Sequence, residues 1–180
     1  MSQMAHRKQL ETTDLEFFLA AYRESTGRYV VEANPSERPD FICRINNNRE
    51  VGIELTKIVR EPETAFWQRI LYGRDYLDAS DLPEKIIGVI EKKSPKCSEA
   101  TWQTPDDTIL VIQLMDCPFS AVHSLISERW TDDICKSSGF SEIWLADYSE
   151  LDAYGAIELC ALFPASLAGY YQREKGKPYG

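Results

Sequence analysis

Two carboxylates stand in segments that otherwise have the composition of β-strands. Asp40 follows Pro39 and precedes the mostly apolar segment 41–45, and Glu54 lies within the apolar segment 51–55. Strand interiors favour β-branched and aromatic side chains, so a carboxylate in such a position requires an explanation. Two carboxylates held close together repel each other unless a proton or a cation lies between them. The chemistry that this pattern suggests is that of a hard divalent cation, Mg²⁺ or Mn²⁺, bound by oxygen ligands.

The spacing of the two segments predicts that these carboxylates face each other. Three asparagines, residues 46–48, separate the segments and tolerate the backbone of a short hairpin loop. A three-residue loop places Ile45 opposite Arg49, and Asp40 then lies opposite Glu54 with the Cβ atoms about 4.5–5.5 Å apart. A loop of two or four residues would split the apolar rows of the two strands across opposite faces. The alternative is a solvent-exposed strand edge, where Asp40 begins the strand and Glu54 faces water.

The elements around this hairpin predict an α/β fold with a central mixed β-sheet flanked by helices. Thr13 and Glu16 have the spacing of a capping box, which predicts that the first helix begins there. The expected elements are a helix at 13–24, strands at 28–32, 40–45 and 50–57, helical residues at 62–70, a helix after 81–83 with Lys93 near its end, a buried strand at 108–115, a helix at 121–134, and strands at 142–146 and 156–162. We expect a single domain over residues 1–180, with its core at about 13–147 and a flexible tail at 173–180.

Composition narrows the classes of function. Among 180 residues, 20 are basic and 29 are acidic, for a net charge of −9, which excludes a broad basic surface that wraps nucleic acid. Two histidines and five scattered cysteines exclude a histidine-based zinc centre and a disulfide framework, and indicate a reducing compartment. The polar N-terminus and the lack of long apolar runs predict a cytoplasmic protein without a membrane segment.

The sequence resembles the PD-(D/E)xK, or restriction-endonuclease-like, nuclease superfamily. The resemblance rests on Pro39-Asp40 at the start of one strand, on the Gly-Ile-Glu-Leu-Thr of residues 52–56 on the next, and on the order of elements over about 13–147. It implies an αβββαβ core in which Asp40 and Glu54 bind a catalytic Mg²⁺ or Mn²⁺, and the carbonyl of Leu55 completes the site. The implied reaction is hydrolysis of phosphodiester bonds in nucleic acid, with DNA favoured over RNA.

One position departs from the family pattern. The superfamily places a lysine two residues after the acidic residue, and this position is Thr56 here. Lys57 is adjacent but points to the other face unless the strand ends or bulges at Thr56. Lys93 could supply the charge instead, although a lysine near a helix end also suits the helix dipole and solvent.

Several alternatives stay open at this point. A carboxylate from the first helix often joins the site in this superfamily, and Glu24 is preferred to Glu16 because the capping box accounts for Glu16; Glu32 on the first strand is a third candidate.

The departure at Thr56 is compatible with a nuclease that uses a relocated lysine, or with an inactive binding or assembly module on the same fold. A homodimer or a protein partner would supply basic surface to a nuclease of this charge. A small-molecule hydrolase is a third class, and it would require a deep pocket.

Overall fold

A computed structural model describes residues 3–46, 49–58, 81–97, 102–103, 107–121, 124–126 and 132–171 of the chain. The first half contains α1 (Gln3–Thr26), β1 (Val30–Pro35), β2 (Phe41–Ile45), β3 (Glu50–Ile58) and α3 (Leu82–Cys97). The second half contains β4 (Thr108–Leu114), the 3₁₀ turn η1 (Phe119–Ala121), α5 (Asp132–Ser137), β5 (Glu142–Asp147), α6 (Leu151–Tyr154), β6 (Glu158–Phe163) and β7 (Gly169–Tyr171).

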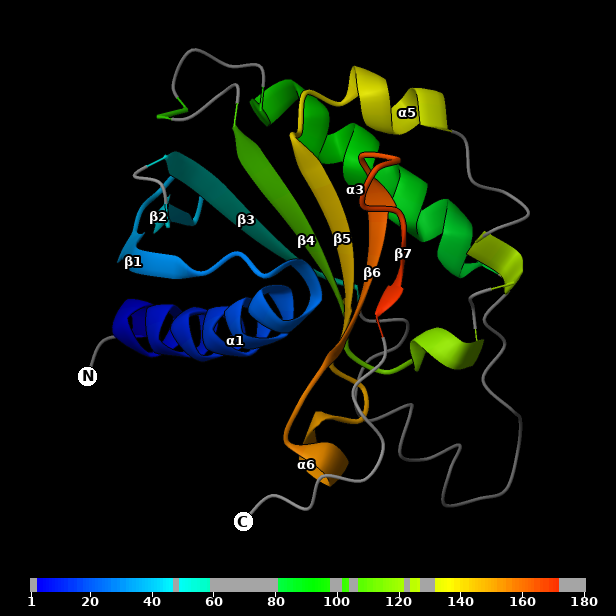
Figure 1. The fold of residues 1–180 in the computed structure, drawn as a ribbon, viewed down its shortest axis with the longest axis horizontal. Coiled ribbons are helices and arrows are strands. Elements are labelled where there is room, and N and C mark those ends of the chain that lie inside the picture. Colours follow the sequence, from blue (N-terminus) through cyan, green and yellow to red (C-terminus); the bar gives the residue numbers. More distant parts are fainter. Residues whose placement is uncertain are drawn as a thin grey trace.

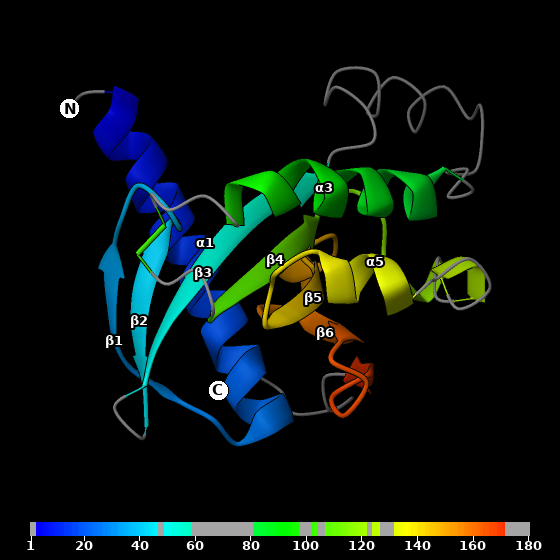
Figure 2. The ribbon, with the colours of Figure 1, turned by 90° about the horizontal axis from the view of Figure 1, so that it is seen from above.

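The strands form one seven-stranded mixed sheet in which they lie in chain order. The pairs β1–β2 and β2–β3 are antiparallel, β3–β4 and β4–β5 are parallel, and β5–β6 and β6–β7 are antiparallel. Figure 1 shows α1 on one face of the sheet and α3 and α5 on the other. Seen from above in Figure 2, α3 runs across β3 and β4 on its face. The prediction of an α/β fold with a mixed sheet flanked by helices is confirmed.

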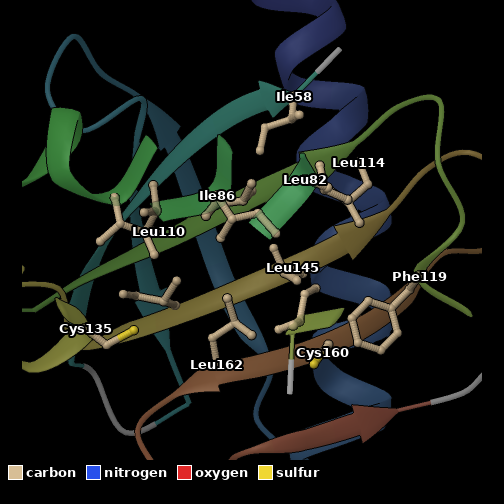
Figure 3. Close-up of a cluster of buried hydrophobic side chains, with 14 of the residues drawn as sticks. Ile58, Leu82, Ile86, Leu110, Leu114, Phe119, Cys135, Leu145, Cys160 and Leu162 are labelled. Atoms are coloured by element: carbon tan, nitrogen blue, oxygen red, sulfur yellow. The ribbon is translucent and has the colours of Figure 1, made fainter. Parts of the chain in front are cut away.

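Each face of the sheet carries its own hydrophobic core. On the α1 side, Leu15, Phe18 and Tyr22 of the helix pack against the sheet. On the α3 side, Leu82, Ile86 and Ile90 recur at helical spacing and are fully buried; Figure 3 shows part of this cluster. All seven residues of β4 are buried, as expected for a strand covered on both faces. The sheet therefore holds its two flanking layers of helices in fixed positions.

The first helix extends further toward the N-terminus than the sequence predicted. α1 includes Gln3, and Thr13 lies in its interior, where its hydroxyl group donates a hydrogen bond to the Gln9 carbonyl oxygen at 3.2 Å. The capping box of Thr13 and Glu16 was therefore a wrong prediction. The preceding residues, which include alanine, arginine, lysine, glutamine and leucine, are good helix formers and continue the helix without a cap at Thr13.

Other elements differ from the sequence predictions in smaller ways. β1 continues to Pro35, because a proline at the end of an edge strand removes no hydrogen bond from the ladder. α6 and β7 were not predicted. Within the predicted helix at 121–134, residues 124–126 and α5 are helical. The predicted helical residues at 62–70 and the tail at 173–180 lie outside the described residues. No helix in the described ranges is both long and apolar enough to cross a membrane.

Candidate metal centre

The predicted register of the β2–β3 hairpin is confirmed. The Ile45 amide donates a hydrogen bond to the Arg49 carbonyl oxygen at 2.9 Å, and Phe41 is paired with Ile53. The next position in this register is Asp40, which lies beside Glu54 at the point where β2 begins. The two carboxylates that the sequence singled out are thus brought together.

Main-chain groups of β3 face Asp40. The Leu55 amide donates a hydrogen bond of 2.9 Å to Asp40 Oδ2. In this register the residue opposite Leu55 is Pro39, which has no N–H group to offer to the ladder. Because the N–H and C=O groups of one strand residue point to the same side, the Leu55 carbonyl also points toward the Asp40 side of β3. An oxygen that a regular hairpin would use in pairing is therefore directed to the side of β3 on which Asp40 lies.

Lys93 reaches the same place from α3. Ile86 and Ile90 fix the inward face of this helix, and Lys93 follows Ile90 by three residues on that face. Its Nζ atom forms a salt bridge with Oε1 of Glu54, and both side chains are mostly buried. Of the two interpretations that the sequence left open for Lys93, the structure selects contact with Glu54 over a position in solvent.

Lys57 does not lie at this centre. β3 continues in regular parallel register with β4 as far as Ile58, without a bulge at Thr56. Lys57 therefore points to the α1 face, where its Nζ atom lies 2.7 Å from Oδ2 of Asp14. This corrects its inclusion among the candidate catalytic residues. Thr56 shares a face with Glu54 because the two are separated by two positions on the strand.

The three acidic residues proposed as additional ligands lie elsewhere. Glu16 and Glu24 are exposed on α1, and Glu24 follows Glu11 by thirteen residues, about 20 Å along the helix. Glu32 is exposed on β1 and forms a salt bridge with Arg44 at 3.2 Å. The carboxylate of α1 that acts on Asp40 is Glu11.

Sequence reasoning missed Glu11 because it placed the start of the helix at Thr13. Glu11 precedes the buried Leu15 by four residues, so it continues the inward stripe of α1. Its Oε1 atom accepts a hydrogen bond of 2.8 Å from Arg7 Nε, and its Oε2 atom lies 3.7 Å from Lys8 Nζ. Its side chain is only 16% exposed. A first helix predicted to begin before residue 11 would have shown that Glu11 lies on the same face as Leu15.

The electrostatic environment disfavours the charge on Asp40. Burial and the neighbouring Glu54 raise the pKa of Asp40 to about 6, and Glu11 acts in the same direction. The hydrogen bond from the Leu55 amide and the positive charge of Lys93 act in the opposite direction without reversing the shift. Asp40 is therefore a carboxylate that gains from a nearby cation when it is ionised.

The donors at this centre are oxygens suited to a hard cation. Asp40 and Glu54 are carboxylates, and the Leu55 carbonyl is a neutral oxygen of the kind that accompanies them around Mg²⁺ or Mn²⁺. Within the described ranges, no group of three or more histidine, cysteine, aspartate or glutamate side chains is arranged to hold a metal ion. A cation here would be bound by the two carboxylates, the carbonyl and water. Glu11 would not bind it but adds a negative charge that acts on Asp40.

No family model matches the chain, and no curated protein or solved structure is significantly similar to it.

Proposed function

We propose that the protein is a divalent-metal-dependent nuclease with a restriction-endonuclease-like core. The observation that carries this proposal is the position of Lys93, whose ammonium group contacts Glu54 on the face of β3 that also carries Thr56. The superfamily pattern would place its lysine at Thr56. A lysine from α3 thus supplies a positive charge beside the same acidic residue, although it comes from a different element.

The order of elements supports the same proposal. Among the elements that the structure describes, α1, the strands β1 to β3, α3 and β4 have the αβββαβ order that the resemblance implies. In this order the hairpin supplies Asp40 and Glu54, and α3 supplies Lys93, which contacts Glu54. Two separate parts of the chain thus contribute charged groups to one location, and Glu11 of α1 adds a negative charge that raises the pKa of Asp40.

In the proposed reaction, the bound cation and the side chains of the protein have different roles. A bound Mg²⁺ or Mn²⁺ lowers the pKa of a water molecule and neutralises charge on a phosphate group. Asp40, Glu54 and the Leu55 carbonyl hold that cation. Lys93 keeps an ammonium group beside Glu54, where it can bind a phosphate oxygen or orient the attacking water.

The substrate that this centre suits is nucleic acid, with DNA favoured over RNA. The net charge of −9 opposes tight binding over a wide surface. Basic side chains are nevertheless present close to the centre: Arg7 is 80% exposed beside Glu11, and Lys92 is exposed next to Lys93. Binding to the phosphate backbone is therefore local and weak, and a homodimer or partner would add further basic surface.

The test is cleavage of supercoiled DNA, single-stranded DNA and RNA in Mg²⁺ or Mn²⁺. Wild type is compared with Asp40→Asn, Glu54→Gln and Lys93→Met, and we expect cleavage that needs metal and falls at least about a hundredfold in each variant, in line with the loss of one electrostatic catalytic group. Lys85→Met is the matched control, because Lys85 lies on the same helix eight residues before Lys93, about 12 Å along the axis, and pairs with Asp81 at 2.8 Å. Cleavage that all variants retain would reveal a contaminating nuclease.

A second candidate is an inactive binding or assembly module on this fold. The observation in its favour is the same ion pair, because Lys93 already neutralises Glu54 without a metal. Such a module need not bind Mn²⁺ and would cleave no substrate. Absence of cleavage by a folded wild type that also binds no Mn²⁺ would favour this candidate over the nuclease.

A further inference from the structure

One side chain of α1 binds the segment that joins β1 to β2 and carries Asp40. Lys8 Nζ donates a hydrogen bond of 2.7 Å to the Ser36 carbonyl oxygen. The same ammonium group lies 6.0 Å from the ring centroid of Phe41, the first residue of β2. Ser36 precedes the turn between the two strands and Phe41 follows it, so Lys8 lies against both ends of the segment that contains Asp40.

Hydrogen bonds continue from this attachment to the Asp40 carboxylate. The Ser36 amide donates a hydrogen bond of 2.8 Å to the Asp40 carbonyl oxygen, which closes the turn of residues 37–39. The Asp40 side chain in turn accepts a hydrogen bond of 2.9 Å from the Leu55 amide of β3. Three hydrogen bonds thus connect Lys8 of α1 to β3, and Asp40 lies within this chain of contacts.

The surroundings of Lys8 keep its ammonium group in this position. The Lys8 side chain is 34% exposed, and Glu11, three residues further along the helix, places its Oε2 atom 3.7 Å from Nζ. A hydrogen bond from a charged donor is stronger than one between neutral groups. Connecting segments move more than the strands that they join, so a bond to a packed helix restricts this one. Without Lys8, the segment before Asp40 loses this attachment to α1.

We propose that Lys8 is a positioning residue that holds Asp40 in its metal-binding place by fixing the turn before it. This inference rests on the proposed metal centre. Lys8 acts through the main chain of Ser36 from the α1 face of the sheet, so it does not need to reach Glu54 or the cation. Outer partners that fix the position of a metal ligand raise the affinity of the site for its ion.

The first measurement is hydrogen exchange of the Leu55 amide without metal, followed by nuclear magnetic resonance. This amide binds Asp40 Oδ2, so its exchange rate reports how firmly the carboxylate is held. We expect Lys8→Met to speed the exchange about tenfold, through loss of one hydrogen bond from a charged donor. Lys8→Arg keeps a charged donor and should stay within about twofold of wild type.

Tyr148→Phe is the matched control for attachment of α1 to the sheet. The Tyr148 hydroxyl group donates a hydrogen bond of 2.6 Å to the Asp14 main-chain oxygen, and Tyr148 directly follows the end of β5. The variant therefore also removes one bond from a side chain to the main chain between α1 and the sheet, but at a place away from Asp40. It should leave the Leu55 exchange rate within about twofold of wild type.

The second measurement is the affinity for Mn²⁺, from electron paramagnetic resonance titration of the same proteins. Lys8→Met should bind Mn²⁺ about tenfold more weakly, and Lys8→Arg and Tyr148→Phe should stay within about twofold of wild type. An unchanged exchange rate or affinity in Lys8→Met, or equal losses in Lys8→Met and Tyr148→Phe, overturns the inference while the metal centre stands. A wild type that binds no Mn²⁺, or that binds it as Asp40→Asn does, overturns the proposed function and this inference together.

Discussion

Replacing Asp40 by asparagine is expected to stabilise the metal-free protein. The pKa of Asp40 is raised from 3.8 to about 6, so ionisation in the folded state carries a cost that ionisation in the unfolded state does not. A shift of about two units corresponds to about 3 kcal/mol. Asparagine has nearly the same shape, its side-chain oxygen can still accept the hydrogen bond from the Leu55 amide, and it presents no second charge to Glu54.

Because the pKa of Asp40 is raised in the folded state, the difference in stability between Asp40→Asn and wild type depends on pH. Below about pH 4 Asp40 is protonated in both states, so the variant and wild type should be equally stable. As the pH rises from about 4 to about 6, wild type loses up to about 3 kcal/mol relative to Asp40→Asn, and the difference stays constant above about pH 6. Urea unfolding in a chelator at about pH 4, 6 and 8 measures this difference.

The same experiment with Mn²⁺ gives the opposite ranking. Wild type should gain about 4 kcal/mol at a metal concentration about one thousand times the dissociation constant, which exceeds its deficit of about 3 kcal/mol, and Asp40→Asn should gain nothing. Asp152→Asn is the control, because Asp152 is an exposed carboxylate on α6. The reasoning is refuted if Asp40→Asn is less stable than wild type at pH 8 without metal, or if its advantage persists at pH 4.

Three further changes test the packing and charge arrangement. Lys93→Met leaves the buried Glu54 without its partner and should lower the free energy of unfolding at pH 8 by about 3 kcal/mol. Urea unfolding measures this loss, and Mn²⁺ should recover part of it. Glu142→Gln removes a buried charge that binds Arg28 at 2.6 Å and weakens its charge-assisted hydrogen bond; because Arg28 is 41% exposed and can be hydrated, the cost should be about 1.5 kcal/mol by the same method, with Mn²⁺ affinity unchanged. Ile90→Ala opens a cavity under α3 and should cost about 3 kcal/mol; a loss below about 1 kcal/mol in calorimetry would contradict its full burial.

The hairpin and its carboxylates could be predicted from the sequence because the relevant interactions are short in range. Alternating apolar residues and a three-residue loop allow one register that keeps both apolar rows together, and the structure has that register. The amino-acid pattern alone therefore pairs Asp40 with Glu54. The carbonyl direction of Leu55 also follows from this register and from the proline at position 39.

The rest of the site depends on how helices lie against the sheet. The sequence shows that Lys93 shares a face with Ile90, but the contact with Glu54 also requires the direction in which α3 crosses β3, which no local pattern encodes. Glu11 was missed for a different reason. A capping signal at Thr13 competed with the helix propensity of the preceding residues, and the propensity determined where the helix runs.

The most direct test of the central claim is a calorimetric titration of Mn²⁺ into wild type, Asp40→Asn and Asp152→Asn at pH 8. We predict saturable binding to wild type and Asp152→Asn, and no saturable binding to Asp40→Asn. Equal binding to all three proteins, or no binding to wild type at millimolar Mn²⁺, would contradict a metal centre at Asp40 and Glu54.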